Sequence, residues 1–353
     1  MERALKLAAR GLYTTTPNPR VGCVLVKDGV VVGEGWHERA GEGHAEVRAL
    51  ALARGAAQGA TAYVTLEPCT HHGRTPPCVQ ALIASRVARV VSAMKDPNPL
   101  VAGKGVEALQ AAGIVAETGL LEAQARELNV GFIARMTRGR PWVRVKIAAS
   151  LDGRTALASG RSQWITGEAA RRDGHRWRAR ACAVLTGIGT VRDDDPQLNV
   201  RDVETPRQPV RIVVDGRLET PLQARVMGPG TLIATVSADA VRAAALREHG
   251  AELIVVPGTA DRVDLAALMH ELGRRHYNEV HVEAGRTLNG ALLAAGLADE
   301  LLIYFAPLAL GDTARGMFAL PALEALDGAR RFRMREVRRI GEDVRLIARM
   351  AED

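Results

Sequence analysis

Residues 68–78 read PCTHHGRTPPC, a segment with Cys69 and Cys78 nine positions apart and two histidines between them. A cysteine pair of this kind can be a disulfide, a redox pair, two buried packing thiols or two metal ligands. Only four cysteines occur among 353 residues, the others being Cys23 and Cys182, so they are not the disulfide framework of a small secreted domain. The choice among the other readings depends on which residues can join this pair.

The segment HAE at residues 44–46 supplies a third metal ligand and a carboxylate. One histidine and two thiolates leave the fourth tetrahedral position open, as catalytic zinc requires. Positions i and i+2 of a helix face different ways, so His44 and Glu46 can converge only at a helix N-terminus, where the glycines of AGEGHAE place them. We expect Cys78 in the first turn of the next helix, whose dipole lowers a thiol pKa, and Cys69 directly after a buried strand. The combined pattern favours a zinc centre over packing thiols.

The loop between the two cysteines holds three further polar residues of interest. A fourth protein ligand would close a catalytic zinc site, so we favour substrate contact or loop structure for His71 and His72. Arg74 fits either a phosphate contact or a solvated position, and the sequence leaves both open. Cys23 and Cys182 have no partner nearby in the sequence, and we expect both in the hydrophobic core.

Strand and helix patterns alternate through the first 135 residues and again in the second part of the chain, which indicates two layered α/β domains. The polar segment TRGRP at 137–141 is the predicted linker, and it divides the chain into domains 1–139 and 140–353. Within the first domain, the segment KDG at 27–29 joins two β-branched runs as a hairpin.

Two helices of the first domain are predicted with definite limits. One begins with Thr75 as N-cap and Pro76 at its first position, a favoured place for proline. The other, LLEAQARELNVGFIARM at 120–136, reads as one long helix.

Composition limits the classes of function. No apolar run approaches the length of a membrane span, and the first residues, MERALKLAARG, lack the features of a signal peptide, so we expect a cytoplasmic protein. The net charge of +7 is scattered and aromatic residues are only 3%. This composition argues against nucleic acid as a partner and suits an anionic substrate or a phosphate-bearing cofactor. We also expect a homo-oligomer, either a dimer or a tetramer.

Two glycine-bearing turns mark the second domain. In VEAGRTLNGALL at 282–293, a strand leads through Gly285 into a helix that begins near Thr287. TGIGT at 186–190 is a second turn from strand to helix. Helix N-termini beside glycine bind phosphates through backbone N–H groups, so the two turns could lie along a dinucleotide, although neither has the GxGxxG pattern.

These residues resemble known families. Cytidine deaminase-like enzymes carry H-x-E with P-C-x-x-C, whereas eight residues separate the cysteines here. HAEV, TLEPC and HHGRTPPC, with TPNPRVGCV upstream and DPNPLVAGKG downstream, are similar to the bifunctional riboflavin biosynthesis family, in which a pyrimidine deaminase is fused to a reductase. The resemblance covers essentially the whole chain. It implies a cytidine deaminase-like three-layer domain followed by a dihydrofolate reductase-like domain.

For the first domain, the resemblance implies zinc on His44, Cys69 and Cys78, with Glu46 carrying a proton from the attacking water to the departing amine. It further places Asn18, Asp96 and Asn98 near the pyrimidine, whereas from the residues alone an asparagine beside proline is first a turn residue. The implied substrate is 2,5-diamino-6-ribosylamino-4(3H)-pyrimidinone 5′-phosphate, which loses its 2-amino group as ammonia.

For the second domain, the resemblance implies that NADPH reduces the ribosyl C1′ to give a ribityl chain. The implied NADPH contacts are Ala148, Trp164, Thr190, Asp194, Gly285, Arg286, Thr287, Leu288, Asn289, Gly290 and Ala291. The implied substrate contacts are Ser162, Arg178, Leu198, Arg201 and Glu283. An arginine pair suits the 5′-phosphate of the substrate. From the residues alone, Arg178 would be a solvated helix position and Asp194 a plain turn residue.

Arg286 departs from the family pattern, which usually has proline after EAG. Arginine adds charge and backbone freedom there, and both altered cofactor binding and no effect stay open. Lys146 and Asp152, which flank the segment AAS, are candidates for the proton donor of the reductase, and either could be structural.

Two other functions fit parts of the sequence. One is a nucleic-acid-editing zinc deaminase with a C-terminal binding module, against which the long cysteine gap and the scarce aromatics count. The other keeps the deaminase and makes the second domain a non-catalytic unit for dimerisation or substrate binding. The bifunctional enzyme accounts for more of the motifs than either.

Overall fold

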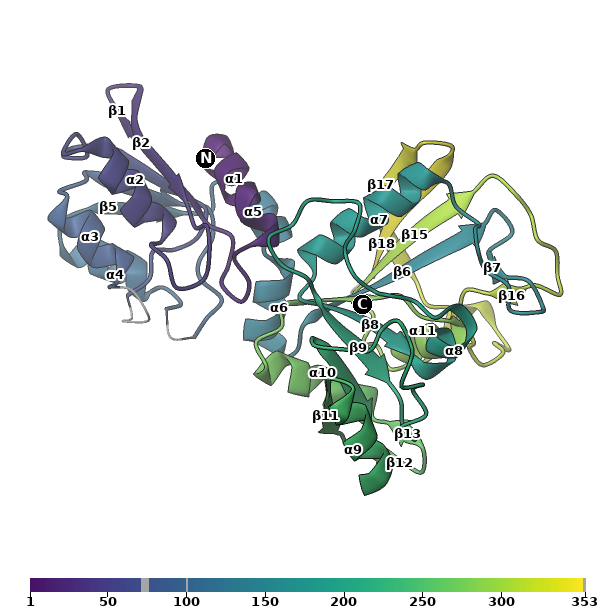
Figure 1. The fold of residues 1–353 in the computed structure, drawn as a ribbon. Helices are drawn as coiled ribbons and strands as arrows, with labels where there is room; N and C mark the ends of the chain where they lie inside the picture. The colour runs from purple at the N-terminus through teal and green to yellow at the C-terminus, as the bar shows by residue number, and fades with distance from the viewer. Residues whose placement is uncertain (71–75, 100, 352–353) are drawn as a thin grey trace. The chain divides into compact units, whose positions relative to one another are not determined.

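The computed structural model describes residues 1–70, 76–99 and 101–351. The chain divides into two compact units, Met1–Gly139 and Arg140–Asp353, each with its own sheet (Figure 1). Among the described residues, no helix combines the length and the apolar character that crossing a membrane requires.

A five-stranded sheet in the order β2-β1-β3-β4-β5 forms the centre of the first unit, with β3, β4 and β5 parallel. The strands are β1 (Gly22–Lys27), β2 (Val30–Trp36), β3 (Thr61–Val64), β4 (Arg89–Ser92) and β5 (Val115–Thr118). The helices are α1 (Glu2–Ala9), η1 (Arg10–Tyr13), α2 (Ala45–Ala53), α3 (Cys78–Ala84), α4 (Lys104–Ala111), α5 (Glu122–Leu128) and α6 (Val130–Arg138). The predicted hairpin is confirmed, since β1 and β2 pair antiparallel.

Alternation along β1 explains why helices cover both faces of this sheet. Cys23 and Leu25 point to one face, where they pack with alanines of α2. On the opposite face, Val24 packs with Ala4 and Leu7 of α1. The first unit is therefore a three-layer α/β/α domain, as predicted. Cys23 is fully buried, which confirms its place in the core.

Two helix limits differ from the prediction. The helix α3 begins at Cys78 with the extended Pro77 as its N-cap, so the start predicted at Pro76 is wrong. A residue that precedes proline is disfavoured in the helical region, which keeps Pro76 outside the helix. Thr75, the predicted N-cap, lies outside the described residues. The long helix predicted over 120–136 is broken at Asn129 into α5 and α6.

The second unit is built on a nine-stranded sheet in the order β11-β10-β9-β8-β14-β6-β15-β18-β17. All neighbours from β11 to β15 are parallel, while β18 and β17 add an antiparallel edge. Its strands are β6 (Trp142–Ser150), β8 (Ala183–Gly187), β9 (Val210–Val214), β10 (Thr231–Thr235), β11 (Ala251–Val255), β14 (Glu279–Val282), β15 (Glu300–Ala306), β17 (Phe332–Ile340) and β18 (Asp343–Met350).

Smaller elements complete the second unit. Two short two-stranded sheets pair β7 (Arg154–Ala156) with β16 (Arg315–Gly316) and β12 (Gly258–Thr259) with β13 (Arg262–Val263). The helices are α7 (Glu168–Arg180), α8 (Ile188–Asp194), α9 (Ala240–Glu248), α10 (Leu265–Arg274), α11 (Arg286–Ala294) and η2 (Leu326–Gly328). Aliphatic residues of β6, β8, β14 and β15 form the main core with α10 and α11. Cys182 is buried directly before β8, as predicted.

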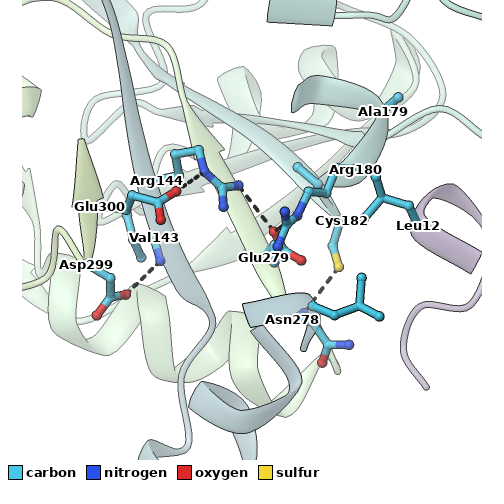
Figure 2. Close-up of polar contacts among 12 residues, drawn as sticks. Leu12, Val143, Arg144, Ala179, Arg180, Cys182, Asn278, Glu279, Asp299 and Glu300 are labelled. Carbon is cyan, nitrogen blue, oxygen red and sulfur yellow. Dashed lines mark hydrogen bonds and ion pairs between the residues drawn. The ribbon is translucent and has the colours of Figure 1, made fainter. Parts of the chain in front are cut away.

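The amino ends of the central strands hold a buried ion-pair network (Figure 2). Arg144 of β6 lies between two carboxylates, with Nε 2.5 Å from Oε1 of Glu300 and Nη1 3.2 Å from Oε2 of Glu279. Arg180 also binds Glu279, and Arg349 also binds Glu300. Because side chains at the carboxyl ends of parallel strands meet at the opposite edge of the sheet, that edge is left free for a site.

Candidate active sites

The histidine and both cysteines predicted as metal ligands come together at one point of the first unit. His44 is the N-cap of α2, Cys78 is the first residue of α3, and Cys69 follows the carboxyl end of β3. His44 Nδ1 lies 3.2 Å from Cys78 Sγ and 3.6 Å from Cys69 Sγ. One ligand atom from each of the three residues lies within 4.8 Å of the other two. Two sulfurs and one imidazole nitrogen, converging from three different segments, are a donor set that suits zinc.

The local electrostatics favour a thiolate in this cluster. The hydrogen bond from the Cys78 thiol holds the pKa of Cys69 well below its ordinary value, and the backbone N–H of Cys78 also donates to Cys69 Sγ at 3.4 Å. The hydrogen bond with Cys69 raises the pKa of His44 above its ordinary value. A negative sulfur is thus available before any cation binds, as metal ligation needs.

Glu46 lies in the first turn of α2 and is only 3% exposed. Burial raises its pKa to about 7, and the nearby Cys69 thiolate acts in the same direction. A carboxyl group with a pKa near neutrality can both accept and donate a proton under ordinary conditions. The side chain therefore fits the proton-transfer role predicted for it.

Asn18 is connected to this cluster through a residue that the sequence reasoning missed. Asn18 Nδ2 donates to Nε2 of the buried His37 at 3.1 Å, and the ring of His37 meets the ring of His44 edge-on at 5.2 Å. His37 lies seven residues before His44 in the same glycine-rich segment, and this proximity was the only signal in the sequence.

Asp96 and Asn98 follow β4, the parallel neighbour of β3, so they lie at the same sheet edge as Cys69. Asp96 is 8% exposed, and burial raises its pKa to about 7. Its Oδ1 accepts the backbone N–H of Asn98 at 2.8 Å, which fixes the turn between them. His71, His72 and Arg74 lie outside the described residues.

A charged cluster lies at the carboxyl edge of the second sheet, around Glu283. Arg178 binds both carboxylate oxygens of Glu283 and donates to the backbone oxygen of Asn199 at 2.9 Å. Lys146 Nζ lies 3.9 Å from Glu283 Oε2, and Nε2 of the buried His281 lies 3.4 Å from Oε1. Although burial acts in the opposite sense, Arg178 and Lys146 hold the pKa of Glu283 well below its ordinary value. Arg178 is therefore not a solvated helix residue.

The two candidates for the reductase proton donor differ in environment. Asp152 accepts hydrogen bonds from the Ser150 hydroxyl and from the backbone N–H groups of Leu310 and Gly311. The Ser150 hydrogen bond contributes most to lowering the pKa of Asp152 to about 2, so this carboxylate holds a turn and carries no proton near neutrality. Burial lowers the pKa of Lys146, which eases release of its proton.

The two glycine-bearing turns of the second unit lie side by side, since β8 and β14 are parallel neighbours. Thr190 Oγ1 in α8 accepts the backbone N–H of Gly285, the N-cap of α11, at 3.1 Å. Gly187 faces Leu288, and Asn289 donates to the backbone oxygen of Ala284.

The helix expected after Gly285 begins at Arg286, and the segment Arg286–Ala291 forms its first turns. Arg286 and Thr287, the first two residues of this helix, are exposed, and N–H groups in the first turn of a helix can bind phosphate.

The other predicted reductase contacts occupy varied positions. Ser162 Oγ donates to Oδ1 of Asp194 at 2.8 Å, so Asp194 is more than a plain turn residue. Trp164 is 68% exposed, with the guanidinium of Arg171 4.7 Å from its ring centroid. Three predicted contacts remain. Ala148 lies in β6, Leu198 is buried, and the guanidinium of Arg201 donates to Oδ1 of Asn199.

Comparison with known proteins agrees with this arrangement. Residues 1–94 match the cytidine and deoxycytidylate deaminase zinc-binding region, and residues 141–346 match the RibD C-terminal domain. The riboflavin biosynthesis protein RibD of Escherichia coli is 52% identical over 98% of this chain and 96% of its own length. The one from Haemophilus influenzae is 48% identical over 98% and 95%.

Solved structures of related proteins have the same fold over nearly the whole chain. RibD of Acinetobacter baumannii superimposes with a TM-score of 0.92 at 46% identity, covering 99% of this chain and 98% of that one. A Thermotoga maritima protein described as a diaminohydroxyphosphoribosylaminopyrimidine deaminase and 5-amino-6-(5-phosphoribosylamino)uracil reductase gives 0.88 at 33% identity, covering 99% and 97%.

Fold and site together define a two-domain enzyme, a zinc-dependent deaminase of cytidine deaminase-like fold joined to a reductase of dihydrofolate reductase-like fold. The chain belongs to the family of the riboflavin biosynthesis protein RibD, as the sequence motifs predicted. It is a bifunctional hydrolase and oxidoreductase, and its first domain carries the zinc-binding region of the deaminases. Because the second domain is a reductase, the alternative in which it only dimerises or binds substrate is excluded.

Proposed function

We propose that the chain catalyses two successive steps on one phosphorylated pyrimidine. The first removes the 2-amino group of 2,5-diamino-6-ribosylamino-4(3H)-pyrimidinone 5′-phosphate by hydrolysis. The second reduces the ribosyl group of 5-amino-6-(5-phosphoribosylamino)uracil to a ribityl chain. The activities named for the T. maritima protein, together with 33% identity over 99% of this chain, support this assignment.

In the deaminase step, His44, Cys69 and Cys78 hold zinc, which when bound lowers the pKa of a coordinated water and makes it a nucleophile near neutral pH. Glu46 accepts a proton on a carboxylate oxygen and donates it to the departing amino group, which leaves as ammonia. The burial of Glu46 and its pKa near 7 support this role.

Asn18, Asp96 and Asn98 bind the pyrimidine in this proposal. Asp96 and Asn98 share a sheet edge with Cys69, and Asn18 is connected to His44 through His37. Their amide and carboxyl groups can exchange hydrogen bonds with the ring nitrogens and the exocyclic groups of a pyrimidine.

In the reductase step, NADPH supplies a hydride to C1′. We assign cofactor contacts to Ala148, Trp164, Thr190, Asp194, Gly285, Arg286, Thr287, Leu288, Asn289, Gly290 and Ala291. We assign substrate contacts to Ser162, Arg178, Leu198, Arg201 and Glu283. Lys146 donates the proton that the opening sugar ring takes up, which its half-buried position beside Glu283 supports.

Arg201 is the better candidate of the arginine pair for the 5′-phosphate. Arg178 already has a two-oxygen ion pair with Glu283, whereas within the described part of the chain the Arg201 side chain donates hydrogen bonds only to neutral oxygens, those of Gln197 and Asn199. An exposed guanidinium without a carboxylate on its nitrogens can bind phosphate without losing an ion pair.

One observation carries the proposal: a histidine and two cysteines within 4.8 Å of one another, beside a buried glutamate at a helix N-terminus. The test follows ammonia release and NADPH absorbance in one cuvette, with wild-type protein and a Glu46→Gln variant given the diaminopyrimidinone. We expect ammonia followed by NADPH loss in the wild type, and neither in the variant. The variant should still oxidise NADPH when given the deaminated intermediate. If the zinc-loaded wild-type protein released no ammonia, the assignment of this substrate would be refuted.

We further propose a cytoplasmic homo-oligomer, a dimer or a tetramer, that binds no nucleic acid. Exposed apolar side chains such as Leu323 and Leu326 in the second unit support association. Light scattering of the purified chain measures its mass, and a monomer at micromolar concentration would contradict association.

A further inference from the structure

Glu67 is a buried carboxylate that the proposed chemistry does not use. It lies two residues before Cys69, is 2% exposed, and its backbone N–H donates to the oxygen of Met94 at 3.0 Å. A buried carboxylate is costly unless hydrogen bonds compensate it, so its partners indicate its role.

Among the described residues, the hydrogen bonds that the Glu67 carboxylate accepts come from the backbone of Asp96 and of the segment 103–106. Oε2 accepts the N–H groups of Asp96 at 3.1 Å and Gly103 at 2.9 Å. Oε1 accepts those of Gly105 at 2.9 Å and Val106 at 3.2 Å. Each oxygen thus has two donors.

These contacts replace the usual cap of α4. Its N-cap is Gly103, which has no side chain to accept the unpaired N–H groups of the first turn. Glu67 accepts two of them from outside the helix, where the positive end of the helix dipole stabilises a negative charge. Gly105 permits the approach, since a Cβ there would lie 2.3 Å from the backbone oxygen of Pro68.

We propose that Glu67 is a positioning residue for deamination, which fixes Asp96 and Asn98 relative to the metal ligand Cys69. On one side it lies two residues before this ligand in the chain. On the other it binds the backbone of Asp96, whose carboxylate in turn accepts the N–H of Asn98. This inference rests on the pyrimidine contacts proposed above, because it explains how they are held at a set distance from the reacting centre.

The test is Glu67→Gln, a change of the same size that replaces one acceptor oxygen with an NH₂ group facing two N–H donors. We expect the deaminase KM to rise about 10- to 100-fold with a smaller change in kcat, while zinc content stays that of the wild type. Reductase turnover of the deaminated intermediate on the same chain should be unchanged. Glu107→Gln, the same change at an exposed position of α4, is the matched control and should behave as wild type.

A second measurement separates positioning from a general structural effect. If Glu67 acts through the segment 96–98, adding Asn98→Ala to Glu67→Gln should raise KM far less than the product of the two single effects. The positioning role would be overturned if the rise in KM of the double variant equalled the product of the two single rises. Loss of zinc from Glu67→Gln would also overturn it. Should Glu67→Gln not fold, Gly105→Ala decides, because its Cβ displaces the first turn of α4 from an intact carboxylate. A wild-type KM in Gly105→Ala would then refute the inference.

The outcomes also distinguish this inference from the proposed function. If Asn98→Ala raises KM and Glu67→Gln does not, only the positioning role fails. If neither Asn98→Ala nor Asp96→Asn raises KM, the pyrimidine contacts fail, and the positioning role fails with them.

Discussion

His175 shows how burial at a single residue makes the stability of the second unit depend on pH. Its side chain is buried in α7, and Nδ1 accepts the backbone N–H of Arg201 at 3.2 Å, which requires an unprotonated nitrogen. Burial, followed by the charge of Arg178, lowers its pKa to about 4. An unfolded histidine has a pKa of about 6.5.

Between pH 6.5 and 4, the unfolded chain binds a proton at this residue that the folded chain does not bind. His175 therefore lowers the stability as pH falls through this window, and makes no such contribution above it. We expect that His175→Gln, which retains an acceptor for Arg201, loses less thermal stability than wild type between pH 7 and pH 5. Calorimetry at both pH values measures this difference. Equal losses of Tm in the two proteins would contradict the argument.

At the same scale, the sequence predicted the residues whose chemistry is distinctive and missed those whose role depends on contacts. A histidine and two cysteines with neighbouring glutamate and proline leave few alternatives to zinc, so His44, Cys69 and Cys78 could be found from spacing. The roles of His37 and Glu67 could not be predicted from spacing. The ring of His37 contacts the ring of His44, and the carboxylate of Glu67 accepts backbone N–H groups far along the chain, and both contacts form only in the folded chain.

Among the elements, the break between α5 and α6 depends on one side chain. Asn129 is 1% exposed, accepts the N–H of Arg20 at 2.8 Å and donates to its backbone oxygen at 3.0 Å. Because Asn129 pairs with both backbone groups of Arg20, it holds the segment that leads into β1 and interrupts the helix that its own sequence favours.

We expect Asn129→Ala to lower the free energy of unfolding of the first unit by about 2 kcal/mol, since it removes two buried hydrogen bonds to the backbone of Arg20. Denaturant unfolding, monitored by loss of deaminase activity, measures the change. Gln124→Ala, at an exposed position of α5, is the control and should change stability by less than about 0.5 kcal/mol. A similar stability for both variants would refute this role of Asn129.

The strand β17 shows where pattern reading fails at this scale. Its sequence, FRMREVRRI, has four arginines and does not alternate apolar and polar residues throughout, so the pattern alone does not indicate a strand. It forms nevertheless, because its backbone pairs with β18 from Phe332 to Ile340 at the edge of the sheet, with a register shift between Met334 and Glu336. By contrast, the sequence predicted β8 and β14 as the strands that lead into the two glycine-bearing turns, because each contains valine, which favours strands.

In the whole molecule, the buried network around Arg144 joins the central strands of the second unit (Figure 2). Arg144 is 1% exposed, and its guanidinium also stacks 4.3 Å from the ring centroid of Trp177. We expect Arg144→Met to destabilise this unit by about 3 kcal/mol, because Glu279 and Glu300 lose a shared buried cation. Both keep an outer arginine, so the loss stays at the lower end of the range for broken buried pairs.

Chemical unfolding monitored by NADPH oxidation activity measures this loss. The control is Arg172→Met, which removes an exposed i, i+4 ion pair with Glu168 on α7 and should cost less than about 0.5 kcal/mol. Equal stability of Arg144→Met and wild type would show that the network contributes no net stability.

The division into two catalytic units was within reach of the sequence because each carries its own alternation of strands and helices and its own motifs. What could not be predicted is the arrangement inside each site. The pairing of Arg178 with Glu283, and the hydrogen bond between Thr190 and Gly285, arise only when β8 and β14 become neighbours.

The most direct test of a zinc deaminase joined to an independent reductase is removal of the metal. The chain is treated with a chelator and dialysed, and its zinc content is measured. Ammonia release from the diaminopyrimidinone and NADPH oxidation with the deaminated intermediate are then assayed separately. We expect the metal-free chain to release no ammonia, to oxidise NADPH at the untreated rate, and to recover ammonia release when zinc is restored. Ammonia release at the untreated rate from the metal-free chain would contradict the account.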